Sequence, residues 1–190
     1  MADCTYKTNK YKLPCFHIVG FTASNSNFTA AVVFMLRETT DWYERSLKAF
    51  LIIMGTLEIK VILTDREPAL ALALENCLPS VKQIYCLWHI EKNIATKCKG
   101  GLSKDEFSGF IDDWKKWIVQ AGTEEGLEEG IEALRSKYQP KRQFETIMDY
   151  IDSLLHDRTR FVHAWTNQYL HLGQRNTSRV EGAHRSLKDI

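Results

Sequence analysis

Two short apolar runs, Ile59–Leu63 and Val81–Cys86, constrain the fold most, because each predicts a short buried strand and a helical segment separates them. Pro68 suits the first turn of that helix, which continues through Ala69–Cys77. A strand, a helix and a second strand in this order predict a right-handed crossover between strands of one mixed sheet.

The N-terminal segment predicts more strands. The apolar runs Leu13–Phe21 and Phe28–Leu36 flank a polar turn and indicate a hairpin, and an initial strand has to fit into Ala2–Thr5. Asp41, with Glu44 three residues later, favours a helix start before the apolar face of residues 42–54. The first half of the chain is therefore expected to be an α/β core.

The second half predicts helices only. Ser103 and Glu106 form a capping-box pattern at the start of a helix over Phe107–Val119. Further helical patterns cover 88–98, 123–138, 144–155, 161–169 and 178–188. We therefore expect a core over residues 1–99, a helical insertion over 100–176 and a final core helix over 177–190.

Composition excludes several classes of protein. The 190 residues are 44% hydrophobic and 26% charged, as in a soluble globular protein, and no apolar run is long enough to span a membrane. There is no signal-peptide pattern, and the five irregularly spaced cysteines indicate reduced thiols, so a cytosolic or nuclear location is expected. Patterns for a nucleophile elbow, a phosphate-binding loop, a dinucleotide fold and a zinc protease are absent.

Two acids stand at positions that suggest metal chemistry. Asp65 directly follows the apolar run ending at Leu63, and Asp3 lies in the short initial strand. Burying two neighbouring carboxylates is costly, and a divalent cation resolves their repulsion. Two Mg²⁺ ions about 4 Å apart can activate the attacking oxygen and stabilise the leaving oxygen in phosphoryl transfer.

Each acid also has an ordinary structural explanation. Asp65 suits the N-terminus of the helix that begins near Pro68, and Asp3 suits a solvated chain end. Glu181 follows Ser178 in a capping-box pattern, which would use the glutamate to bind backbone N–H groups.

Four segments together resemble the transposases of Mutator-like elements. Asp3–Asn9 resembles their first-aspartate motif, and Val61–Glu67 their second. Cys86–Asn93 is similar to their CxxH motif, and Ala164–Asn167 together with Thr177–His184 resembles their closing segment with the catalytic glutamate. The similarity covers nearly the whole chain.

The resemblance implies a ribonuclease H-like mixed sheet with flanking helices and an all-helical insertion before the last catalytic helix. Asp3, Asp65 and Glu181 would hold two divalent ions, Mg²⁺ or Mn²⁺. The implied activity is cleavage of double-stranded DNA at transposon ends and strand transfer into target DNA, in the nucleus. A homo-oligomer is compatible with it, whereas a membrane or a small-molecule substrate is not implied.

Several basic residues near the motifs are candidates for DNA contacts: Lys7, Lys10, Arg66, Lys92, Arg179 and Arg185. The roles of Cys86 and His89 stay open between a packed thiol with a hydrogen-bonded histidine and a part in positioning DNA or a metal-bound water. A zinc pair lacks two partners.

Only Met1 and Ala2 precede Asp3, so the first strand is expected to be truncated and the chain to be a fragment or a decayed copy. A domesticated, non-catalytic DNA-binding regulator descended from such a transposase is the alternative. A generic ribonuclease H-like nuclease would explain the acids but not the CxxH motif.

Overall fold

A computed structural model of the chain describes residues 1–6, 9–22, 24, 26–55, 58–97, 102–139, 144–177, 180 and 182. Its contacts divide the chain into two compact units, residues 1–88 with 172–190 and residues 89–171. The first unit holds the strands and the second consists of helices. The predicted boundaries at residues 99 and 176 remain predictions.

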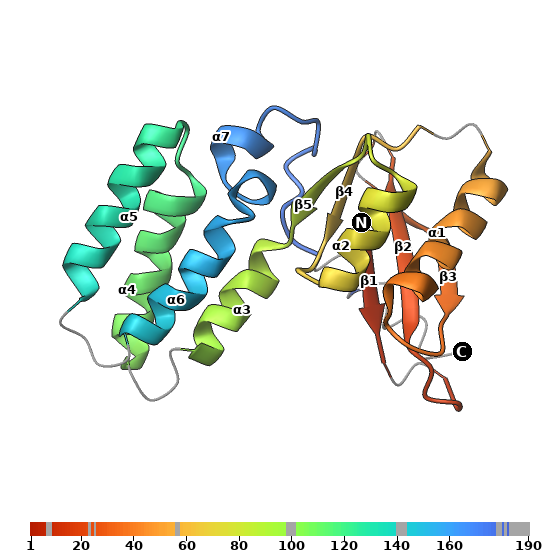
Figure 1. Cartoon of the computed structure of the whole chain (residues 1–190), viewed down its shortest axis with the longest axis horizontal. Coiled ribbons are helices and arrows are strands. Elements are labelled where there is room, and N and C mark those ends of the chain that lie inside the picture. Colours follow the sequence, from red (N-terminus) through yellow and green to blue (C-terminus); the bar gives the residue numbers. More distant parts are fainter. Residues whose placement is uncertain are drawn as a thin grey trace. The chain divides into compact units, whose positions relative to one another are not determined.

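The first unit contains strands in both orientations. Strands β1 (Ala2–Thr5), β2 (Cys15–Phe21) and β3 (Asn27–Phe34) form an antiparallel sheet in that order, and β4 (Val61–Thr64) pairs with β5 (Lys82–Tyr85) in parallel. β1 also lies against β4 (Figure 1). The strand in Ala2–Thr5, the hairpin and the parallel pair are thus confirmed, and the unit is mixed α/β.

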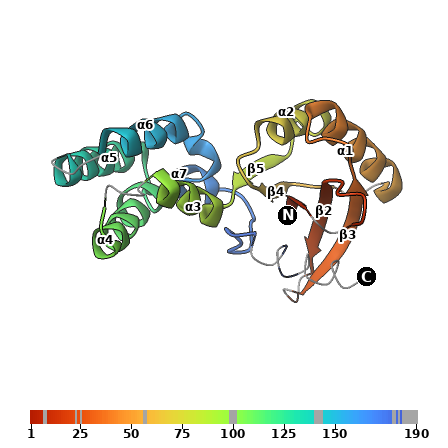
Figure 2. The same cartoon turned by 90° about the horizontal axis from the view of Figure 1, so that it is seen from below.

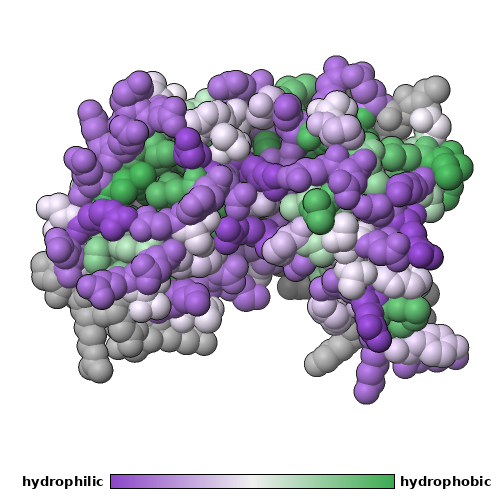
Figure 3. Space-filling model, in the orientation of Figure 1, coloured by the Kyte–Doolittle hydropathy of each residue, from purple (hydrophilic) through white to green (hydrophobic). Residues whose placement is uncertain are grey.

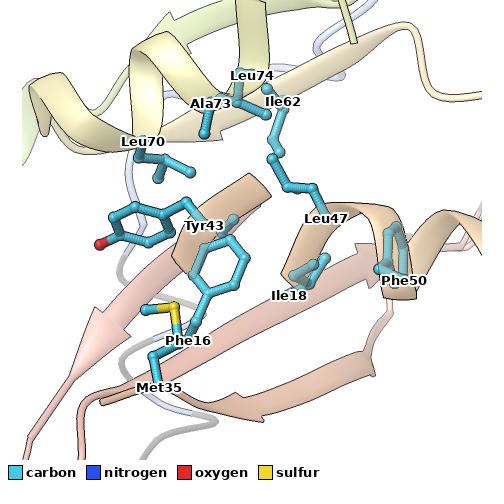
Figure 4. Close-up of a cluster of buried hydrophobic side chains, with 11 residues drawn as sticks. Phe16, Ile18, Met35, Tyr43, Leu47, Phe50, Ile62, Leu70, Ala73 and Leu74 are labelled. Atoms are coloured by element: carbon cyan, nitrogen blue, oxygen red, sulfur yellow. The ribbon is translucent and has the colours of Figure 1, made fainter. Parts of the chain in front are cut away.

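Helices α1 (Thr40–Met54) and α2 (Pro68–Cys77) cover one face of these strands (Figure 2). Side chains from both helices meet side chains from β2 and β4 in a buried core (Figure 4). The rings of Phe16 and Tyr43 pack edge-to-face there, with centroids 5.2 Å apart. The largest side chains of this core are Phe16, Met35, Tyr43, Leu47, Phe50, Ile62 and Leu70.

The prediction that Asp41 starts helix α1 as its capping residue is wrong. Asp41 lies inside the helix, and the residue at the N-cap is Thr39, whose side chain makes no capping hydrogen bond. Asp41 instead pairs with Arg45 one turn later, at 2.9 Å, and Glu44 pairs with Lys48 at 3.0 Å. The acid spacing that resembles a capping box therefore serves ion pairs on the exposed helix face.

The second unit confirms the capping box. Ser103 and Glu106 exchange hydrogen bonds at the start of α4 (Lys104–Trp114), which runs into a π-helical turn, η1 (Lys115–Val119). Other helices are α3 (Leu87–Lys97), whose first two residues belong to the first unit, α5 (Glu124–Tyr138), α6 (Phe144–Leu155), the 3₁₀ turn η2 (Arg158–Arg160) and α7 (His163–Thr166). No helix in the described ranges is long and apolar enough to cross a membrane.

The helix predicted over residues 161–169 is much shorter in the structure. After Thr166 the backbone makes tighter bonds three residues apart, from the Gln168 N–H to Trp165 and from the Tyr169 N–H to Thr166. These bonds replace the α-helical pattern and end the helix.

The backbones of α5 and η1 approach each other closely at Gly130 of α5. A Cβ atom there would overlap with the backbone carbonyl of Trp117 in η1, whereas a Cβ at Gly109 of α4 would have only the Tyr138 hydroxyl nearby, at 3.8 Å. We expect Gly130→Ala to lower the free energy of unfolding by about 1–2 kcal/mol through overpacking.

The matched control is Gly109→Ala, which raises helix propensity without a clash. It should raise the free energy of unfolding by up to about 1 kcal/mol. Urea unfolding followed by far-UV circular dichroism measures both. Equal effects of the two substitutions would contradict the close approach.

Candidate catalytic site

Asp3 is buried in β1. Only 6% of its surface is exposed, and its Oδ1 accepts a hydrogen bond from the Cys4 backbone N–H at 2.8 Å. Asp3 lies opposite His17 of β2, and cross-strand partners share a face, so both lie on the sheet face away from Ala2 and Cys4. The alternative of a solvated chain end is therefore wrong.

Asp65 follows the last residue of β4, which is firmly held. The Thr64 hydroxyl donates to the Asp65 carbonyl at 2.7 Å and accepts from the Gln83 amide of β5 at 2.8 Å. The capping role considered for Asp65 belongs to Glu67, whose carboxylate accepts from the Ala69 N–H at 3.2 Å at the start of α2.

The electrostatic surroundings of Asp65 disfavour its charge. Burial, and then the neighbouring carboxylates of Glu67 and Glu38, raise the pKa of Asp65 to about 6. A carboxyl group in such surroundings is stabilised by a proton or by a cation.

Glu38 is a site residue that sequence reasoning missed. It precedes α1, and its carboxylate acts on the Cys4 thiol in β1 and on the Tyr6 hydroxyl just after it. Its Oε1 atom is buried and has no hydrogen-bond partner among the described residues. Burial and Glu38 raise the pKa of Cys4, and the hydrogen bond to Glu38 raises the pKa of Tyr6.

Tyr43 connects this group to the core. Burial, then the nearby Cys4 and Glu38 and finally Asp65, raise the pKa of Tyr43. Residues from β1, the segment before α1, α1 itself and the end of β4 thus meet at one acidic site. No pattern in the sequence marked Glu38, because it lies in neither a strand nor a helix.

The described residues do not form a complete metal cage. Nowhere in the described part of the chain do three or more His, Cys, Asp or Glu side chains stand ready to hold a metal ion. The residues still fit a hard cation: Asp65 has a raised pKa, and Glu38 has an unsatisfied buried oxygen. A metal site here needs a ligand beyond the described residues.

Cys86 anchors a segment that returns from the far end of the chain. It is fully buried after β5, and its sulfur accepts hydrogen bonds from the Thr177 backbone N–H and hydroxyl, both at 3.2 Å. The Leu87 N–H donates to the Arg175 carbonyl at 2.9 Å, and the Trp88 N–H donates to the Asn176 side chain at 3.0 Å. The CxxH motif therefore holds the segment that leads towards residue 181.

The other predicted site residues differ in whether the structure describes them and in how exposed they are. Glu181, Lys7, Arg179 and Arg185 lie outside the described residues. His89 is in the first turn of α3, where burial and then Lys92 lower the pKa of its imidazole. Lys10 and Lys92 are exposed, and Arg66, next to Asp65, is half-buried. The structure thus describes Asp3 and Asp65 at neighbouring strands but not the third acid.

A model of a known family covers this site. The model described as the MULE transposase domain matches residues 1–93 of the chain. Residues 1–93 are thus similar to the MULE transposase domain. The match includes Asp3, Asp65, Cys86 and His89, and it stops before Glu181. The resemblance drawn from the motifs is thereby confirmed.

Relatives among characterised proteins come from Arabidopsis thaliana. Protein FAR1-RELATED SEQUENCE 4 is 26% identical over 60% of this chain, and Protein FAR1-RELATED SEQUENCE 5 is 24% identical over 84%. Protein FAR-RED IMPAIRED RESPONSE 1 is 26% identical over 64% of the chain. The matched parts make up 14%, 19% and 17% of these relatives, so the chain spans less than a fifth of their length.

The raised pKa of Asp65 predicts a pH-dependent stability. Its folded-state value of about 6 lies above the ordinary 3.8, so charging Asp65 destabilises the folded state as the pH rises between these values. We expect Asp65→Asn to raise the free energy of unfolding by about 2 kcal/mol at pH 7.5 in metal-free buffer, and far less at pH 4.

Asp41→Asn is the control, because the Asp41 side chain is 66% exposed and pairs with Arg45 on the helix surface. Its effect should stay within about 0.5 kcal/mol at both pH values. Thermal and urea unfolding at the two pH values measure the difference, and a pH-independent effect of Asp65→Asn would contradict the raised pKa.

Proposed function

We propose that this chain is the catalytic core of a DDE transposase, which cleaves double-stranded DNA and transfers the cleaved strand to target DNA. The observation that carries the proposal is the pair of acids, Asp3 and Asp65, held at neighbouring strands of a MULE transposase domain. Such placement is costly without a cation, and a cation is what phosphoryl transfer requires.

The fold we infer is ribonuclease H-like. Three features support it: the antiparallel β1–β2–β3 sheet, the parallel β4–β5 pair beside β1, and the two helices on one face of the strands. In this arrangement Asp3 and Asp65 belong to neighbouring strands, and the helices of residues 89–171 interrupt the first unit before the last acid in sequence.

Asp3, Asp65 and Glu181 would hold two Mg²⁺ or Mn²⁺ ions. When bound, such ions lower the pKa of an attacking water and stabilise charge on the leaving oxygen. The chain's own contribution is positioning. The Cys4 N–H fixes the Asp3 carboxylate, and Thr64 with Gln83 fixes the strand end before Asp65.

The contacts of Cys86 support a role in completing the site. By holding Thr177, Cys86 ties down the chain four positions before Glu181. We infer that Cys86 positions the segment carrying the third acid and does not itself react. The proposed partners are transposon ends and target DNA, contacted by basic residues such as Arg66 and Lys92, and the proposed location is the nucleus.

A second function is favoured by the relatives. The FAR1-related proteins resemble this chain over most of its length, and one of them is named for a far-red response. The alternative is therefore a domesticated regulator that binds DNA through the same fold without cutting it.

The test is nicking of supercoiled plasmid DNA and joining of a 3′-hydroxyl oligonucleotide by the 190-residue chain, with Mg²⁺ or Mn²⁺. Loss of both activities to background is expected in Asp3→Asn, Asp65→Asn and Glu181→Gln, because each removes a charged ligand. Asp41→Asn, with an exposed acid, should keep full activity.

Mg²⁺ should also raise the melting temperature of the wild-type chain at pH 7.5 but not that of Asp65→Asn. Metal-dependent cleavage that survives in Asp65→Asn would refute the site. DNA binding without any cleavage by the wild-type chain would favour the regulator.

A further inference from the structure

The positive charge of this chain is unevenly distributed. Residues 4–37 contain four basic side chains, Lys7, Lys10, Lys12 and Arg37, and no carboxylate. This segment has a net charge of +4 in a chain whose net charge is +1, so the remaining residues sum to −3. The antiparallel sheet and its turns are therefore one basic part of the molecule, although Asp3 lies in the same sheet.

In the turn between β1 and β2, Lys10 and Lys12 are exposed. The Asn9 side chain accepts hydrogen bonds from the Tyr11 and Leu13 N–H groups, both at 3.1 Å, and donates to the Leu13 carbonyl at 2.8 Å. Lys12 sits at a φ of 57°, in the left-handed region. These local bonds fix the backbone, so the side chains it displays are preorganised for binding.

Two aromatic rings accompany these lysines. Tyr6 is 52% exposed and Tyr11 is 70% exposed. The Lys10 ammonium lies over the Tyr11 ring, 5.0 Å from its centroid. The turn projects at the lower right of Figure 1, and the surface view in the same orientation is largely hydrophilic there (Figure 3).

We call Tyr6, Lys10, Tyr11 and Lys12 the tyrosine–lysine turn. It begins beside the acidic site, because the Glu38 carboxylate raises the pKa of Tyr6 at the start of the turn and also that of Asp65. A ligand bound along the turn would therefore lead towards Glu38 and Asp65.

Exposed tyrosines interleaved with lysines have the chemistry of a single-strand nucleic-acid surface. Lysines bind successive phosphates, and an exposed ring stacks on a base that has left the duplex. An acidic peptide would use the lysines but would gain little from two exposed rings. Duplex DNA keeps its bases stacked inside and offers the rings only sugar and phosphate.

We propose that the tyrosine–lysine turn binds an unpaired DNA strand entering the acidic site, with Tyr11 stacking on a base and Lys10 and Lys12 contacting phosphates. This inference rests on the proposed function, since it names the form of DNA that the site takes. It assigns the turn to a strand already separated from its complement, such as a frayed end next to the cleaved bond.

The test is equilibrium binding of a fluorescent 20-nucleotide oligo-dT and of a 20-base-pair duplex to the full chain, in EDTA so that no cleavage occurs. Tyr11→Ala should weaken oligo-dT binding roughly 5- to 150-fold and duplex binding little. Lys10→Gln/Lys12→Gln should lower the slope of log affinity against log salt by about 1.4 for oligo-dT.

Lys60→Gln/Lys104→Gln is the matched control, since it removes two exposed lysines elsewhere and should leave that slope unchanged. Circular dichroism checks that each variant is folded. Wild-type binding that is unaffected in the turn variants would overturn this inference and leave the proposed function standing.

If Tyr11→Ala lowered the affinities for duplex and for oligo-dT equally, the assignment to an unpaired strand would be overturned. The same would follow if polyglutamate displaced the labelled oligo-dT as well as unlabelled oligo-dT does. A wild-type chain that binds neither DNA would count against the proposed function as well. The cleavage experiment with Asp65→Asn is independent of the turn and separates the two failures.

Discussion

Burial of carboxylates between neighbouring strands is the constraint on which the first unit depends. Asp3 is almost fully buried, and burial together with the carboxylates of Glu67 and Glu38 disfavours the charged form of Asp65. The local structure offsets part of that cost: the Cys4 N–H binds Asp3, and Thr64 and Gln83 join the ends of β4 and β5. Glu67 is occupied in capping α2, so it repels Asp65 without being free to move away.

Much of the fold could be predicted because its signals are local. The strand in Ala2–Thr5, the helix beginning at Pro68 and the Ser103–Glu106 capping box all depend on residues close in sequence. Asp41 shows the limit of such signals, because an acid spacing typical of a cap is equally typical of ion pairs along a helix. Only the actual position of the N-cap, at Thr39 two residues earlier, decides between them.

The rest of the site could not be predicted because it is made by contacts between distant segments. Glu38 gains its importance from Cys4 in β1 and from Tyr6 just after that strand. Cys86 was singled out by its motif, but its partner Thr177 is 91 positions away. A periodicity or a motif can place a residue on an element, whereas it cannot say which remote backbone reaches that residue. The third acid belongs to the same class of problem, since its position depends on how the returning segment is held.

The cost of these acids is also the physical reason to prefer the enzymatic proposal over the regulator. Asparagine at position 65 would keep nearly the same shape and remove the charge that Glu38, Glu67 and burial disfavour. A protein that only binds DNA would gain stability from that exchange and would lose nothing at a surface that attracts phosphates through lysines. A site that must hold a cation cannot make the exchange, because the unfavourable charge is what binds the ion. The raised pKa of Asp65 and the basic turn after β1 would then be complementary features of the proposed site, the first suited to the metal and the second to the DNA strand.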